Sequence, residues 1–152
     1  MIWKFNHREL REHRALIMEL DELNKLSGMV VDAAMEVHRE MGPGLFEKIY
    51  EEPLERELKS RGLTVDRQLA VYVSYKGEPI HDEAYRIDLF VNGEIVVELK
   101  AVAMVLPVHH AQLMSYMRLK KKRVGLLINF FVPLLKEGIS RKIIDYPESI
   151  PL

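Results

Sequence analysis

Helical spacing of apolar residues dominates the first part of the chain. Between about residues 7 and 41, apolar side chains recur every three or four positions, as they do on one face of a helix. Ser27 is a typical helix N-cap residue, so we expect a new helix to begin after it. Gly42, which opens the sequence Gly-Pro-Gly, should end that helix. A further helical pattern runs from about 45 to 60 and stops before Gly62.

From residue 65 onward the apolar pattern has a period of two, which is typical of strands. One strand leads to a turn at Lys76–Gly77 and the beginning of another strand, and a hairpin follows at 85–101. A helix is expected at 107–120, then a buried strand at 123–131 and a short edge strand near the end. The expected fold is α/β, of the α+β sandwich type. A mixed central β-sheet is flanked by helices, in the order α-α-β-β-β-α-β.

The hairpin at 85–101 carries charges where a buried sheet should be apolar: Asp88 on its first strand, Glu98 and Lys100 on its second. A two-residue loop at Asn92–Gly93 would put the acids on opposite faces, because side chains alternate along a strand. A three-residue loop with a left-handed residue shifts the pairing by one and brings all three charges to one face. The apolar pattern favours this register. It gathers on the other face Ile87, Leu89, Val91, Ile95, Val97 and Leu99.

Two carboxylates and a lysine on one strand face suit metal-dependent cleavage of a phosphodiester. Asp88, Glu98 and the backbone carbonyl of Leu99 offer the oxygen ligands that Mg²⁺ prefers. Lys100 would orient or deprotonate the attacking water. The alternative is a half-exposed hairpin whose solvent face carries these charges. Phe90 shares the charged face, which favours partial burial and therefore a functional site.

Four motifs resemble those of a known nuclease superfamily. The sequences "RID" at 86–88 and "ELK" at 98–100 resemble the core of the PD-(D/E)XK superfamily. The sequence "GLFEKIY" at 44–50 resembles the motif that names the GxxExxY protein family, and "QLMSY" at 112–116 resembles the QxxxY motif of RecB-type nuclease domains. The similarity covers roughly residues 26–144. It implies a restriction-endonuclease-like core.

The resemblance also implies roles for individual residues. The catalytic set would be Glu47, Asp88, Glu98 and Lys100, with Lys100 as the catalytic lysine. The metal would be Mg²⁺ or Mn²⁺. Its ligands would be Asp88, Glu98, the helical acid Glu47 and the Leu99 backbone carbonyl.

The remaining motif residues would have supporting roles. Tyr50, Gln112 and Tyr116 would support the site or contact the substrate backbone. Ile87 stands where the superfamily's name implies a proline, and this substitution removes no ligand. An alternative interpretation exists for Glu47: it begins a helix rich in glutamate, and such a run is typical of a solvated acidic face near a helix N-terminus.

Composition narrows the class of protein. The 152 residues suit one domain, which we place at 26–152 after a helical extension at 1–25. The absence of cysteine excludes thiolate catalysis and cysteine-bound zinc, and fits the cytoplasm. The apolar run at 124–135 is too short to span a membrane. An N-terminal helix with Trp3 and Phe5 could pack on a partner chain, which would make the protein a homo-oligomer.

The leading hypothesis is a metal-dependent nuclease that hydrolyses DNA by in-line attack of water. The rival is a catalytically inactive module of the same fold that binds nucleic acid or protein, which the net charge of −1 favours. A third hypothesis, a hydrolase of small substrates, would use His109 or His110, but adjacent helical residues point about 100° apart and cannot share one ion. The basic run at 118–123 is a candidate phosphate contact.

Overall fold

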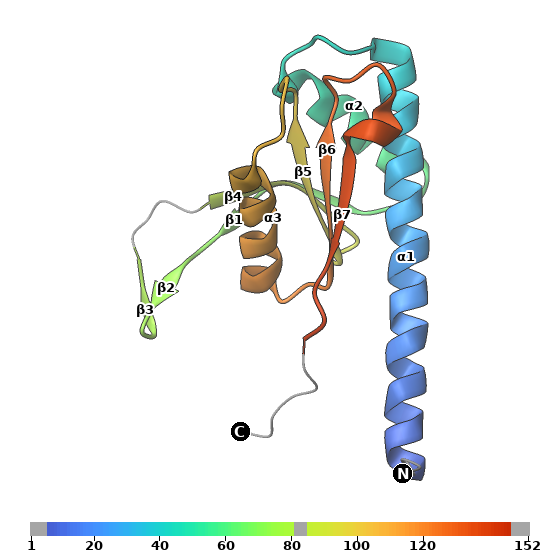
Figure 1. Ribbon diagram of the computed structural model, residues 1–152, viewed down its shortest axis with the longest axis vertical. Coiled ribbons are helices and arrows are strands. Elements are labelled where there is room, and N and C mark those ends of the chain that lie inside the picture. The colour runs from blue at the N-terminus through green and yellow to red at the C-terminus, as the bar shows by residue number, and fades with distance from the viewer. Residues whose placement is uncertain (1–5, 81–84, 147–152) are drawn as a thin grey trace.

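A single long helix opens the structure. The computed structural model describes residues 6–80 and 85–146 (Figure 1). Helix α1 runs without a break over His7–Met41. The predicted new helix after Ser27 is therefore wrong. Ser27 is buried within α1, and its hydroxyl donates a hydrogen bond to the carbonyl of Asn24, so it bonds back to the preceding turn.

The other elements follow close to the predicted places. The turn at Lys76–Gly77 is present, but the strands beside it form a separate two-stranded ribbon. The predicted edge strand near the end is also present, as β7. The elements are α2 (Glu47–Ser60), β1 (Val65–Val71), β2 (Ser74–Tyr75), β3 (Glu78–Pro79), β4 (Tyr85–Val91), β5 (Ile95–Lys100), α3 (Pro107–Lys120), β6 (Val124–Asn129), the short 3₁₀ helix η1 (Leu135–Gly138) and β7 (Ile139–Ile143).

The main sheet is mixed, as predicted. Its five strands lie in the order β1-β4-β5-β6-β7. The β5–β6 pair is parallel and the other neighbours are antiparallel. Helix α3 makes the crossover that a parallel pair requires. The fold is therefore an α+β architecture consistent with a restriction-endonuclease-like core.

Helices cover both faces of this sheet (Figure 1). The larger buried cluster joins α1 and α2 to one face, and the smaller joins α3 to the other. Gly125 on β6 lets α3 approach closely, because a Cβ built there would lie 2.5 Å from the sulfur of Met117. The two clusters make the central strands buried on both faces, so a charge on these strands is enclosed by protein.

The hairpin has the predicted register. Val91 pairs with Ile95, so the loop has three residues, and both Asn92 and Gly93 have positive φ, of 51° and 63°. One member of the predicted apolar face lies elsewhere. Ile87 packs in the smaller cluster with Phe90, on the α3 side. It departs from simple alternation because β4 loses its regular pairing at Asp88, immediately after Ile87.

The first half of α1 lies largely outside the packed body. Leu23 is the first buried residue of the helix, and most residues before it are exposed. We propose that the division near residue 25 is a change of packing within one continuous helix. Trp3 and Phe5 lie outside the described residues. No helix in the described part of the chain is long and apolar enough to cross a membrane.

Candidate active site

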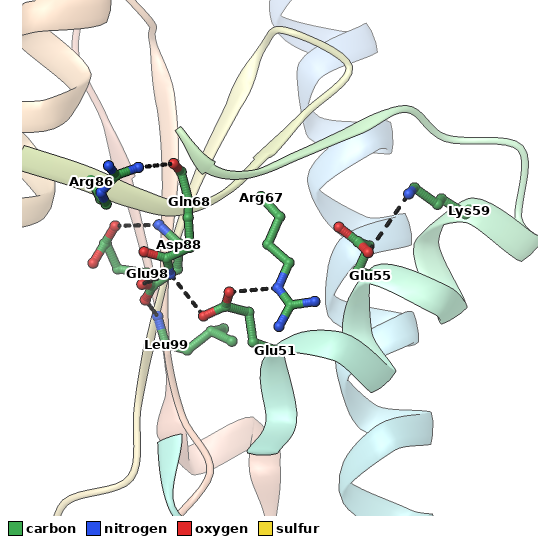
Figure 2. Close-up of polar contacts among 9 residues, drawn as sticks. All are labelled: Glu51, Glu55, Lys59, Arg67, Gln68, Arg86, Asp88, Glu98 and Leu99. Atoms are coloured by element: carbon green, nitrogen blue, oxygen red, sulfur yellow. Dashed lines mark hydrogen bonds and ion pairs between the residues drawn. The ribbon is translucent and has the colours of Figure 1, made fainter. Parts of the chain in front are cut away.

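The centre of the site is the point where β4 and β5 separate. Their regular pairing ends at Leu89–Val97. One residue further on, the backbone N–H of Asp88 donates to Glu98 Oε1 at 3.1 Å, and the N–H of Leu99 donates to Asp88 Oδ2 at 2.8 Å (Figure 2). The two carboxylates thus replace the missing strand-to-strand hydrogen bonds. This exchange fixes both side chains next to each other at the point where β4 and β5 separate, which we call the fork.

Both acids are buried, with Asp88 9% and Glu98 3% exposed. Burial, and after it the neighbouring charge of Asp88, raises the pKa of Glu98 to about 8. Burial also raises the pKa of Asp88, while the hydrogen bond from Leu99 opposes that rise. Two buried carboxylates this close repel each other when both are ionised. The metal-free pair therefore favours a proton on one of the acids or a cation beside them.

Glu47 and Lys100 lie at the edge of this pair. Glu47 is the first residue of α2, and Lys100 is the last of β5. Burial raises the pKa of Glu47, and the charge of Lys100 lowers it, followed by a smaller rise caused by Asp88. Lys100 likewise lowers the pKa of Asp88 and of Glu98. The four residues of the predicted catalytic set are thus electrostatic neighbours, with one cation opposing three acids.

Tyr50 has its contacts in the core. Its ring is buried and stacks on Phe130, with centroids 4.2 Å apart and planes 6° apart. Its hydroxyl donates to the carbonyl of Gly42 at 2.6 Å and accepts from the N–H of Leu45 at 3.1 Å. Tyr50 therefore fixes the loop that leads into Glu47.

Glu51 is a member of the site that the sequence interpretation missed. In the sequence it is one of several glutamates in a helix whose acidic run is typical of a solvated face, yet it is only 5% exposed. Its carboxylate accepts from Arg67 Nε at 2.7 Å and from Gln68 Nε2 at 2.9 Å (Figure 2). Gln68 Nε2 also donates to Asp88 Oδ1 at 3.2 Å. The available signal was helical spacing, because Glu51 is one turn after Glu47 and shares its face.

Gln68 connects Glu51 to Asp88 through an unusual backbone. Its φ is 54°, in a region that residues with a Cβ rarely adopt. The pairs on either side of it, Arg67–Leu89 and Leu69–Ile87, are regular, and Arg86 Nη1 donates to the Gln68 carbonyl at 3.1 Å. The strand β1 is therefore interrupted opposite Asp88. This interruption lets the Gln68 amide reach both carboxylates.

Helix α3 closes the other side of the site. Tyr116 is 4% exposed, and Gln112 Nε2 donates to its hydroxyl at 2.9 Å. Burial raises the pKa of Tyr116, and the charge of Glu98 raises it further. The predicted Gln112 and Tyr116 are thus hydrogen-bonded to each other, and Tyr116 lies within electrostatic range of the acid pair.

A buried asparagine holds the chain after Lys100. Asn129, at the end of β6, accepts from the N–H of Val102 at 3.1 Å and donates to the carbonyl of Val102 at 2.9 Å. The N–H of Phe130 donates to the Lys100 carbonyl at 2.8 Å. The sequence showed Asn129 only as an interruption in an apolar run. Its contacts indicate that it fixes the end of β5.

His109 has a partner at the start of its own helix, whereas the buried Nδ1 of His110 has no hydrogen-bond partner among the described residues. His109 Nδ1 accepts from the N–H of Leu106 at 3.0 Å, which caps the start of α3. Burial lowers the pKa of His110, followed by the charge of Lys142. Within residues 6–80 and 85–146, no three His, Asp or Glu side chains group closely enough to hold a metal ion. These contacts give no support to the histidine hydrolase.

The possible ligands at the fork suit a divalent cation that prefers oxygen ligands. Mg²⁺ is commonly bound through one or two carboxylates and completes its shell with water and phosphate oxygens. Asp88 and Glu98 supply the two carboxylates, and the Leu99 carbonyl lies between Glu98 and Lys100 in the chain. Glu47 does not form a three-carboxylate group with them in this structure, and its role as a ligand stays a prediction.

Comparison with known proteins identifies the family. A family model described as the PD-(D/E)XK nuclease superfamily matches residues 24–142. The chain belongs to the PD-(D/E)XK nuclease superfamily. No curated protein and no solved structure matched the chain. The match includes every residue of the predicted site, and it begins within α1, near the position where that helix joins the packed body. The finer resemblance to GxxExxY proteins stays a prediction.

Proposed function

We propose that this PD-(D/E)XK protein is a Mg²⁺- or Mn²⁺-dependent nuclease that hydrolyses phosphodiester bonds of DNA by in-line attack of water. The observation that carries the proposal is the fork of β4 and β5. It holds two buried carboxylates in fixed orientations, with a lysine beside them on the same strand as Glu98. A buried pair of acids without a cation costs folding free energy, and such a cost is typical of a functional site.

The residues divide the chemistry among them. Asp88, Glu98 and the Leu99 carbonyl would hold the metal ion, which when bound would stabilise the negative charge that develops on the scissile phosphate. Lys100 would position the attacking water and help to remove its proton. Glu47, at the same opening, would contact the metal or that water.

The neighbouring polar residues would keep this geometry. The Gln68 amide holds Asp88 from one side, and Gln112 and Tyr116 lie on the other, where they would contact the substrate backbone. Preorganised groups of this kind stabilise a transition state because they need not rearrange during the reaction.

The test is a cleavage assay on supercoiled plasmid, linear duplex, single-stranded DNA and RNA, with Mg²⁺, Mn²⁺ or EDTA. We expect cleavage of DNA that requires the divalent ion and is abolished by Lys100→Ala and by Glu98→Gln. Lys136→Ala and Glu40→Gln, at exposed positions away from the fork, should cleave like the wild type. Circular dichroism should confirm that each variant is folded.

Two outcomes would count against the proposal in different ways. Cleavage that survives both site substitutions would show that another group or a contaminant carries the activity. If the folded protein binds nucleic acid or a protein partner and cleaves nothing under any condition, the inactive binding module is the correct function.

A further inference from the structure

A cavity of about 670 Å³ lies next to the proposed active site. Its wall comes from three elements: Val73 at the base of the ribbon, Tyr85 at the start of β4, and one side of α3 that includes Gln112, Tyr116 and Arg118. A volume of this size is typical of pockets that enclose a small molecule or a nucleoside. Of the residues given a role in the proposed function, only Gln112 and Tyr116 line this space, and none of those roles fills it.

Two residues of the cavity wall place it beside the acid pair. Tyr85 is three residues before Asp88 on β4, a separation of about 10 Å along a strand. Tyr116 packs in one buried cluster with Val96, which is two residues before Glu98 on β5. If a phosphodiester is cleaved at the fork, a neighbouring nucleotide of the same strand is within reach of the cavity.

The wall has the chemistry that a nucleobase needs. Tyr85 is 57% exposed, and its ring is tilted at 51° to that of Tyr116, with centroids 6.0 Å apart, so it offers an open aromatic face. Aromatic side chains stack on bases of any sequence. The amide of Gln112 and the hydroxyl of Ser115 can hydrogen-bond with a base edge, and Arg118 adds a positive charge for a phosphate.

A base can enter such a cavity only when it is unpaired, because a paired and stacked base hides its faces. We propose that this cavity binds an unpaired nucleobase of a DNA strand, beside the phosphate that is cleaved. The proposal rests on the proposed function for the identity of the strand. It makes single-stranded DNA, or a locally melted end, the preferred substrate over intact duplex.

The ribbon extends the same chemistry away from the cavity. It stands apart from the main sheet on the α3 side (Figure 1). Tyr72, just before β2, and Tyr75 are 68% and 63% exposed, and Lys76 Nζ lies 5.4 Å from the centre of the Tyr75 ring. Exposed aromatic rings combined with positive charge are typical of surfaces that bind single strands. The ribbon would therefore bind the strand that leaves the cavity.

The test measures binding separately from cleavage. Fluorescence anisotropy in EDTA compares a labelled single strand with the matched duplex at equal salt. We expect tighter binding of the single strand, about tenfold weaker binding by Tyr85→Ala and nearly normal binding by Tyr85→Phe, because phenylalanine keeps the stacking face. Phe131→Ala, which removes an exposed ring outside the cavity, should bind like the wild type.

Two further measurements locate the base. A 2-aminopurine placed at successive positions of the strand should be quenched at one or two positions, and Tyr85→Ala should remove that quenching. Ala111→Leu narrows the cavity from the α3 wall at an exposed helix position, so it should weaken binding even if Tyr85→Ala fails to fold. A strand with an abasic site at the quenched position should be insensitive to Ala111→Leu.

The outcomes separate this proposal from the proposed function. Equal affinity for single strand and duplex, or no effect of either Tyr85→Ala or Ala111→Leu, overturns the nucleobase pocket even if Lys100-dependent cleavage is present. Tyr85-dependent binding without any cleavage supports the nucleobase pocket and overturns the proposed nuclease function. Binding to no polynucleotide overturns the pocket and favours a protein side chain as its occupant.

Discussion

Replacing Glu98 with glutamine should stabilise the metal-free protein, and the gain should increase with pH. The folded-state pKa of Glu98 is about 8 against an ordinary value of 4.5, chiefly because the carboxyl group is buried. A carboxyl whose pKa is raised by folding contributes stability below its unfolded pKa, and this contribution is lost as pH rises through the folded pKa. The full difference corresponds to roughly 5 kcal/mol, of which about 3 to 4 kcal/mol falls between about pH 5 and pH 8.

Glutamine suits this test because its amide oxygen can still accept the hydrogen bond from the Asp88 N–H. The measurement is urea denaturation in EDTA at constant ionic strength, followed by circular dichroism, for wild type and Glu98→Gln at several pH values. The difference between the two free energies of unfolding should grow by about 3 kcal/mol or more in favour of glutamine from pH 5 to pH 8. Glu40→Gln, at an exposed position of α1, is the matched control and should stay parallel to wild type.

The reasoning fails if the wild-type and Glu98→Gln free energies stay parallel across this range. Ionisation of Glu98 would then cost little folding free energy, and burial at the fork would not disfavour the charged form of its acids. A large pH-dependent gain in the Glu40→Gln control would mean that the effect comes from net charge and not from burial.

Three other predictions use the same variants and methods. Asp88→Asn should gain less stability than Glu98→Gln, because both oxygens of Asp88 accept hydrogen bonds and an amide keeps only one acceptor. In melting curves, Mg²⁺ or Mn²⁺ at about 100 times its dissociation constant should stabilise the wild type by roughly 2.7 kcal/mol and Asp88→Asn by little. Gln68→Gly should be more stable to urea than Gln68→Ala by about 1 kcal/mol, since both lose the side-chain bonds and only glycine tolerates the φ of 54° without strain. Tyr50→Phe should lower stability to urea by about 1 to 3 kcal/mol, because it removes two part-buried hydrogen bonds, to the Gly42 carbonyl and from the Leu45 N–H, each worth about 0.5 to 1.5 kcal/mol.

The sequence predicted the hairpin well because one physical constraint fixed it. Only the three-residue loop between Val91 and Ile95 puts most apolar residues on one face, and that register also brings Asp88 and Glu98 together. The constraint is local, since both strands lie within 17 residues of chain. The misplacement of Ile87 has a cause that is not local, because β1 and β4 interrupt their pairing at Asp88.

The parts of the site that were missed depend on contacts between distant elements. Glu51 resembles its neighbouring glutamates in the sequence, and only the approach of β1 to α2 buries it. The backbone of Gln68 cannot be inferred from its identity, since glutamine shows no preference for positive φ. Ser27 is similar in kind. Serine can cap a new helix or bond back to the preceding turn, and the packing of α1 on the sheet selects the second arrangement.

The crossed hydrogen bonds at the fork also limit how this protein can change during evolution. Asp88 and Glu98 accept from the N–H groups of Leu99 and Asp88, so they complete the sheet as well as the proposed site. If the protein has the proposed activity, a lineage that no longer needed it could lose Lys100 at little structural cost. Loss of either acid to an apolar residue would leave a buried amide unpaired, at about 1 to 3 kcal/mol each. Inactive descendants should therefore replace these acids with other acceptors such as asparagine, glutamine or serine, and retain a fork that still resembles an active centre.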